Sequence, residues 1–228
     1  MPNSTRPTAH DSSSTSRLHR TVVHQPALLR FTLATRVLLA VGFFAPGLTK
    51  LLGRRFVTTV TDDPVGRFFE ALYQAGPYWR FLGAAQVAAA VCVLIPRLRA
   101  LGAVLFAGIT LNIAFITIAL PFGNTAIIAS LMFLASVWLL LWELPSWSGL
   151  LGLSLPPSDE PAVSRFERLG WLAATLGGWG ATCVMRGLLE QGVRPFFLAS
   201  LGLGALGGLV VLAAWVRAAV RPTVRAAA

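Results

Sequence analysis

Four polar side chains lie inside, or close to the ends of, long apolar runs of this sequence. They are Arg36, Lys50, Gln86 and Asn112. Polar groups are costly in such surroundings, so each is a candidate binding residue. The two amides could hydrogen-bond a quinone-like carbonyl or a polar substrate between helices, because an amide both donates and accepts. The two cations could hold an anionic headgroup or substrate. We predict no catalytic residue and no metal ligand.

A purely structural role is the alternative for each of these residues. Gln86 and Asn112 could form hydrogen bonds between helices, which are worth about 0.6 kcal/mol each in measured membrane proteins. Arg36 and Lys50 could extend their charges towards lipid headgroups from the ends of the first apolar run. Both interpretations stay open at this point.

Two acidic side chains have simpler interpretations. Glu70 could pair with one of the Arg residues before it, or face solvent. Glu143 follows Trp142 at the end of an apolar run, and we interpret it as a marker of the membrane interface.

Several kinds of site are excluded by what the sequence lacks. The histidines are His10, His19 and His24, which precede every apolar run, so no span can ligate haem through paired histidines. Cys92 and Cys183 form neither a CxxC pair nor a Cys/His cluster, which excludes a CxxC thiol mechanism and a zinc site. We interpret both cysteines as small apolar side chains.

The composition is that of an integral membrane protein. Hydrophobic residues make up 55% of the 228 residues and charged residues only 12%, against roughly 25% charged residues in soluble domains. The net charge of +10 comes from Arg residues scattered at the ends of apolar runs. That distribution is typical of anchoring at lipid headgroups rather than of nucleic-acid binding.

Residues 100–142 contain no Asp, Glu, Lys, Arg or His. One crossing of a bilayer needs about 20 apolar residues, so this run predicts two spans joined by a turn at 121–124, where Pro and Gly interrupt the helix. The same reasoning along the chain predicts an all-α, polytopic transmembrane helix bundle of about six spans. The predicted spans are 31–52, 79–95, 100–120, 124–142, 169–189 and 195–216.

Shorter signals mark the connections between spans. Asp63-Pro64 predicts the start of an amphipathic helix that Gly76-Pro77 ends. Pro46-Gly47 predicts a kink or a broken last turn in the first span. Gly204 and Gly208 have the GxxxG spacing that is typical of helix–helix contact.

The predicted organisation has five parts. They are a disordered tail at 1–29, a four-helix bundle at 30–143, a loop at 144–168, a two-helix membrane segment at 169–219 and a tail at 220–228. With this order, 12 of the 19 Lys and Arg residues lie on the side of the two termini. Because positive charge is enriched in the cytoplasm, we predict a multi-pass cell-membrane protein with both termini cytoplasmic.

A series of short motifs runs through the first four predicted spans. In chain order they are Arg36 at the start of the first span, Gly47-Leu-Thr-Lys50-Leu at its end, the amphipathic helix, a second span that contains Gly83 and ends in Pro96-Arg-Leu-Arg99, and a long third span with Asn112. With these motifs, residues 31–143 resemble the DoxX-like membrane protein family.

The resemblance implies a four-helix membrane bundle. Some members of that family are linked to quinone-coupled sulfur oxidation and others to redox partners in the membrane. Where the family often has an acidic residue early in the second span, this sequence has Gln86, whose amide cannot transfer a proton as a carboxylate does. Two functions follow as expectations. One is a quinone- or lipid-binding component associated with membrane redox chemistry. The alternative is a non-catalytic transport or assembly partner subunit, associated with another membrane protein or with a second copy of the chain.

Overall fold

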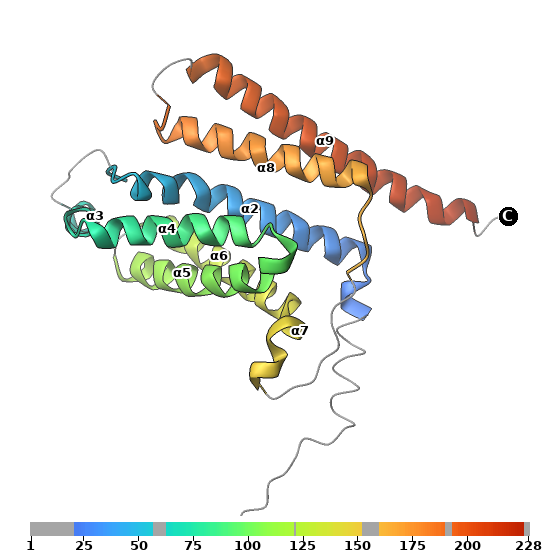
Figure 1. Ribbon diagram of the computed structural model, residues 1–228, viewed down its shortest axis with the longest axis horizontal. Helices are drawn as coiled ribbons and strands as arrows, with labels where there is room; N and C mark the ends of the chain where they lie inside the picture. Colours follow the sequence, from blue (N-terminus) through green and yellow to red (C-terminus); the bar gives the residue numbers. More distant parts are fainter. Residues whose placement is uncertain (1–20, 57–62, 121, 152–159, 190–192, 226–228) are drawn as a thin grey trace, which may run out of the picture.

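The computed structural model describes residues 21–56, 63–120, 122–151, 160–189 and 193–225, and within these ranges it contains helices and no strand (Figure 1). The elements are α2 (Pro26–Leu51), α3 (Pro64–Gln74), α4 (Pro77–Cys92), the 3-10 turn η1 (Pro96–Leu98), α5 (Arg99–Ala119), α6 (Thr125–Trp142), α7 (Leu144–Trp147), the 3-10 turn η2 (Ser148–Leu151), α8 (Arg165–Met185) and α9 (Val193–Arg225).

Four helical stretches are long and apolar enough to cross a membrane. They are Pro26–Leu51, Pro96–Ala119, Thr125–Trp142 and Arg194–Arg217. Helices α4 and α8 coincide with the two other predicted spans, but α4 has only 16 residues, and the first turn of α8 is charged. The all-helical class is therefore confirmed, and four of the predicted spans coincide with helices long and apolar enough to cross a membrane. A crossing by α4 and α8 stays a prediction.

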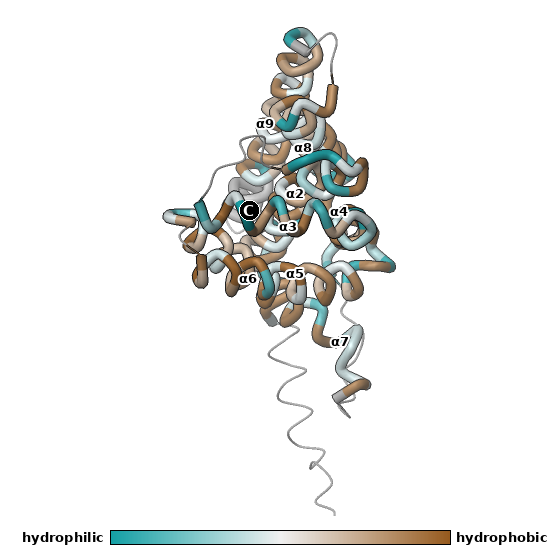
Figure 2. Tube along the Cα trace, turned by 90° about the vertical axis from the view of Figure 1, so that its left-hand side faces the viewer, coloured by the Kyte–Doolittle hydropathy of each residue, from teal (hydrophilic) through white to brown (hydrophobic). Residues whose placement is uncertain are grey.

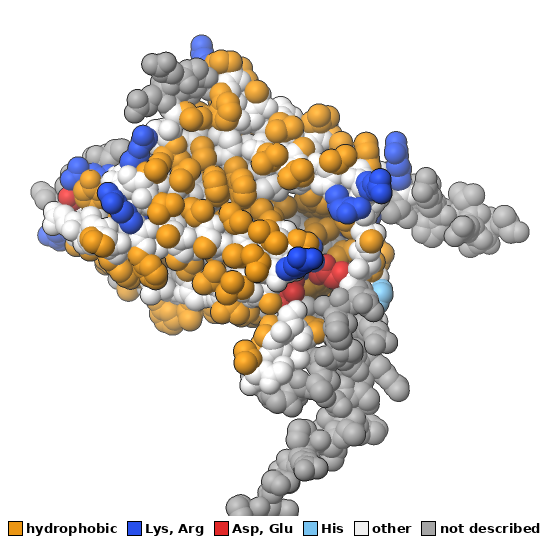
Figure 3. Space-filling view, in the orientation of Figure 1, with side chains coloured by type: hydrophobic (Ala, Val, Ile, Leu, Met, Phe, Trp, Pro, Cys, Tyr) orange, Lys and Arg blue, Asp and Glu red, His pale blue; other side chains and the backbone are white. Residues whose placement is uncertain are grey.

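The helices pack in three layers with α2 at the centre. Helix α2 contacts α4, α6 and α8, while α5 with α6 and α8 with α9 form antiparallel pairs on either side of it (Figures 1 and 2). Hydrophobic side chains cover the middle of the face in Figure 3, and Lys and Arg side chains gather towards its ends. That distribution fits a bundle whose middle lies in hydrocarbon and whose ends reach the headgroups.

Glycines set the closest approach of two helix pairs. A Cβ atom on Gly83 of α4 would lie 2.3 Å from the backbone nitrogen of Leu51 in α2. In the outer pair, a Cβ atom on Gly207 of α9 would lie 2.4 Å from the nitrogen of Ala174 in α8. The predicted GxxxG contact is half right, because Gly204 lies against Gly177 of α8 whereas an added Cβ on Gly208 meets nothing within 4 Å.

The predicted connections agree with the structure in three places. Asp63 caps α3 by accepting a hydrogen bond from the backbone nitrogen of Gly66 at 2.6 Å, and Gly76 with a φ of 49° follows its end. The turn predicted before the third span is η1. The hairpin turn lies between Ala119 and Thr125, although Pro121 is outside the described residues.

Several predicted boundaries are wrong. The tail does not extend to residue 29, because α2 begins at Pro26 and Leu29 is buried beside Val23 and Trp142; residues 1–20 are outside the described part. The segment 144–168 is not all loop, since it holds α7, η2 and the start of α8. The last helix continues into the predicted tail and ends at Arg225.

Pro46 lies inside α2 and does not end the helix. Helix α2 runs through Pro46 to Leu51, so the broken last turn, one of the two predicted outcomes, does not occur, and the kink stays a prediction. Proline removes one backbone donor without preventing its neighbours from continuing a helix that is held by packing on both sides.

Candidate functional site

Lys50 and Gln86 lie together at the end of α2, where that helix meets α4. The Lys50 Nζ atom donates a hydrogen bond to Gln86 Oε1 at 3.0 Å and another to the Pro46 carbonyl at 3.3 Å. Each residue is only 7% exposed. Gly47 and Gly83 allow this meeting, because their lack of side chains brings the two backbones into contact at the same level.

Aromatic rings cover the Lys50 ammonium. Its Nζ atom lies 4.3 Å from the centroid of the Phe56 ring and 5.4 Å from that of Trp79. The Trp79 indole is held in place by a hydrogen bond from its Nε1 atom to the Arg54 carbonyl at 3.0 Å. Arg186, just after α8, places its Cζ atom 4.0 Å from the same Phe56 ring.

Two cations therefore share one aromatic ring, and no carboxylate in the described part of the chain forms an ion pair with Lys50 or Arg186. The carboxylate of Glu70 is already bound by Arg55, at 3.0 and 3.1 Å. An ammonium has three N–H donors, and the described residues supply two oxygen acceptors. The site can therefore accept one further oxygen atom, and a negative charge there would be stabilised.

Arg36 lies nearer the other end of α2, in a cluster of buried charges. Its Nη2 atom donates to Glu143 Oε1 at 2.5 Å and to Glu160 Oε1 at 2.9 Å. Glu160 also accepts hydrogen bonds from Arg99 Nη1 and Trp142 Nε1, both at 2.5 Å. The cluster joins α2, α5 and the end of α6 to the segment that leads into α8.

The pKa values of the two carboxyls in the cluster are shifted in opposite directions from the ordinary value. Burial raises the pKa of Glu143, in spite of the opposing charge of Arg36. Burial also acts to raise the pKa of Glu160, but the hydrogen bond and charge of Arg36 and the charge of Arg99 outweigh it and lower that pKa. Arg36 Nη1 and Arg99 Nε are buried without a hydrogen-bond partner among the described residues.

Arg36 was predicted as a binding residue for an anion, and the structure places two carboxylates of the chain itself against it. We interpret this cluster as a clamp that fixes the segment before α8 onto the bundle. Neither Glu160 nor the partnership of Glu143 was predicted. Glu160 stands in a Pro-rich stretch that resembles a loop, and its contact with Arg36 spans 124 residues of sequence.

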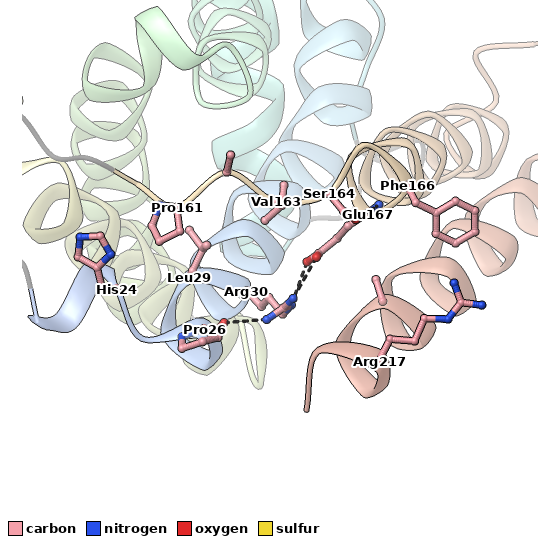
Figure 4. A pocket seen from close by; sticks show the side chains of 12 residues that line it. His24, Pro26, Leu29, Arg30, Pro161, Val163, Ser164, Phe166, Glu167 and Arg217 are labelled. Atoms are coloured by element: carbon pink, nitrogen blue, oxygen red, sulfur yellow. Dashed lines mark hydrogen bonds and ion pairs between the residues drawn. The ribbon is translucent and has the colours of Figure 1, made fainter. Parts of the chain in front are cut away.

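A second ion pair reinforces the clamp beside an open groove of about 440 Å³ between the start of α2, the start of α8 and α9. Arg30 reaches Glu167 with two hydrogen bonds of 2.9 and 3.1 Å (Figure 4). Arg217 lies over the Phe166 ring at 6.0 Å. The central charges of this groove already neutralise each other, which favours a structural role.

Asn112 is not part of either cluster. It is exposed on the outside of α5, whereas Thr110 and Thr117 of the same helix are buried. Thr110 lies 3.1 Å from Ser136 of α6, oxygen to oxygen. The prediction that Asn112 contributes to a polar site inside the bundle is therefore wrong. An evenly apolar helix gives little indication of which face is buried, so the sequence could not orient it.

Comparison with known proteins gives one relative. The uncharacterized protein YwoB of Bacillus subtilis (strain 168) is 34% identical over 113 residues, which make up 47% of this chain and 72% of YwoB. The chain belongs to the family of YwoB. No protein-family model matches the chain, and no solved structure matches it.

The name of YwoB states no activity. The side chains of this member of the YwoB family therefore have to indicate the chemistry that is open to it. Within the described residues, no three His, Cys, Asp or Glu side chains are grouped as metal ligands would be. Cys92 and Cys183 are free thiols. Unused N–H donors remain at both clusters, since Arg36 Nη1 and Arg99 Nε also have no hydrogen-bond partner among the described residues. Arg36 is already neutralised by Glu143 and Glu160, so the described site that lacks an anionic partner is the one formed by Lys50 and Gln86.

Proposed function

We propose that this protein crosses the membrane six times, with both termini in the cytoplasm. At Lys50 and Gln86 it binds a membrane-resident ligand whose oxygen atoms accept hydrogen bonds. Such oxygens occur in a quinone carbonyl and in a lipid phosphate. The DoxX-like resemblance of residues 31–143 supports membrane redox chemistry as the setting, with the protein as a binding component rather than the catalyst.

The observation that carries the proposal is the uncompensated Lys50 ammonium. A buried cation is costly unless it is paired and fully hydrogen-bonded. Here it has an amide oxygen, a backbone carbonyl and two aromatic rings, but no carboxylate among the described residues. A ligand oxygen would supply the missing acceptor, and the half-buried ring of Phe56 would contact the apolar part of the ligand.

The composition of the site also limits what it does. Gln86 cannot carry a proton to or from a ligand at ordinary pH, since an amide does not titrate there. Lys50 is the titratable member of the pair, and we propose that its ammonium holds and polarises a carbonyl or phosphate oxygen. With the predicted orientation, Lys50 lies in the last turn of α2 on the extracytoplasmic side, beside the middle of α4. The headgroup of a lipid or the ring of a quinone would reach it from that side.

Ligand-dependent unfolding tests the proposal. A ligand that binds only the folded protein stabilises it by about 2.7 kcal/mol at 100 times its Kd. We expect either a short-chain benzoquinone or a short-chain anionic phospholipid to stabilise the purified wild type, and to lose this effect in Lys50→Met and Gln86→Leu. Thr117→Val, a buried polar change on α5, is the matched control and should retain it. Stabilisation of wild type and Lys50→Met by the same amount would contradict the site.

A second candidate function is a non-catalytic transport or assembly partner subunit. The outward position of Asn112 favours it, because a polar group on the outer surface of a span points to a protein neighbour. Only 11% of the apolar window of α9 is buried, which leaves further surface for contact. A purified protein that binds neither ligand, yet retains another membrane protein, would favour this alternative.

A further inference from the structure

One amide stands alone on the outer surface of the membrane bundle. Asn112 lies about 20 Å along α5 from Arg99 and about 10 Å from Ala119, at 1.5 Å per residue. It is therefore well inside the apolar part of the helix. Within the described residues of the four candidate spans, no other exposed Asn, Gln or charged side chain lies away from the end of its span. It forms no hydrogen bond with any described residue.

The surroundings of Asn112 form a continuous face suited to another helix. Exposed apolar side chains recur on this side of α5 at spacings of three, four and seven residues; they are Leu101, Val104, Leu111, Phe115 and Ile118. Gly108 lies one turn before Asn112, and an added Cβ there would meet nothing within 4 Å. A small residue beside a polar one allows two helix backbones to approach and hydrogen-bond.

Lipid alone does not satisfy such a residue. Hydrocarbon chains offer neither a donor nor an acceptor, so a polar side chain within a span normally pairs with another polar group. The buried hydroxyls of α5 show this pattern, because Thr110 and Thr117 donate to carbonyls of their own helix. Asn112 forms no such bond within its own helix, and it lies on the opposite side of α5 from Thr110, which contacts Ser136 of α6.

We infer that two copies of this chain associate through this face of α5, with Asn112 hydrogen-bonded to its counterpart in the second copy. An amide carries both a donor and an acceptor, so it is self-complementary about a two-fold axis. The described face carries no charge, so an identical uncharged face of a second copy can pack against it without repulsion. Gly108 on each copy leaves room for the two helices to cross there. The inference is independent of the ligand site, which lies on α2 and α4.

The oligomeric state in mild detergent or lipid nanodiscs tests this inference, measured by native mass spectrometry over a range of protein densities. We expect a dimer for the wild type. One lost pair of interhelical hydrogen bonds in Asn112→Leu should weaken dimerisation roughly three- to tenfold, and Gly108→Ile should weaken it further. Both changes put apolar side chains on an outward surface, so folding is retained. Thr117→Val is the matched control and should dimerise like the wild type.

Cross-linking gives a second readout. In a chain with Cys92→Ser and Cys183→Ser that keeps Asn112, Phe115→Cys on the same face of α5 should form a disulfide-linked dimer on oxidation. Ile127→Cys on the exposed side of α6 should not. A wild type that stays monomeric at every density, or equal dimerisation of wild type, Asn112→Leu and Gly108→Ile, would overturn the inference. A complex in which a different protein covers Asn112 would overturn the choice of a second copy.

Discussion

Replacing Glu160 with Gln tests whether the buried charges around Arg36 hold the segment before α8 onto the bundle. The substitution keeps the size and one acceptor oxygen of the side chain and removes its charge. Glu160 accepts hydrogen bonds from Arg36 at 2.9 Å and from Arg99 and Trp142 at 2.5 Å each. The charge-dependent partners are the two guanidinium groups.

The magnitude follows from burial. The Glu160 side chain is 17% exposed, that of Arg36 3% and that of Arg99 21%. Removing one partner of a buried ion pair costs about 3–5 kcal/mol. Because Arg36 keeps Glu143, we expect a loss near the lower end, about 3 kcal/mol in the free energy of unfolding.

The assay is reversible unfolding in mixed detergent micelles, followed by the loss of helical circular dichroism. The control is Glu70→Gln, which breaks an exposed pair with Arg55 on the surface of α3 and should change stability far less. Arg99→Met should cost less in the Glu160→Gln background than in the wild type, because the two residues share one interaction.

Equal stability of Glu160→Gln, Glu70→Gln and the wild type would refute the clamp. So would strict additivity of the Glu160 and Arg99 changes. Either result would mean that apolar packing alone positions α8.

Two further perturbations follow from the same structure. Because the pKa of Glu143 is raised in the folded protein, the free energy of unfolding should increase as pH falls from neutral towards about 4.5. Because the pKa of Glu160 is lowered, its contribution to stability should be lost as pH falls further. Unfolding measured against pH should show both changes, and Glu143→Gln should remove the first. Gly83→Ala should destabilise the fold by about 1–3 kcal/mol, because its methyl group would press on the backbone of α2, whereas Gly202→Ala, which meets nothing within 4 Å, should not; unchanged stability of Gly83→Ala would contradict the close contact.

The sequence predicted the elements that local chemistry determines. The charge-free run at 100–142 indicated the hairpin of α5 and α6, and the Asp63-Pro64 pair indicated the start of α3. Both signals determine the structure of the same few residues that carry them. The same is true of η1, which begins at Pro96 and is marked by Arg97 and Arg99.

Contacts between distant segments were harder to predict. Glu160 stabilises the fold through Arg36, yet nothing near it in the sequence indicates that partner. The orientation of Asn112 was missed because α5 is apolar on every side, so periodicity does not separate its buried face from its outer face. Lys50 and Gln86 were each predicted as binding residues, and Gly47 and Gly83 were the available signal that they would meet.

The most direct test of the Lys50–Gln86 site is native mass spectrometry of the wild type purified in mild detergent, with lipid extraction of the same sample. We expect a bound quinone or a specific anionic lipid in the wild type that is absent from Lys50→Met and Gln86→Leu. A wild type that carries only bulk phospholipid, or a ligand that persists in both variants, would contradict this expectation.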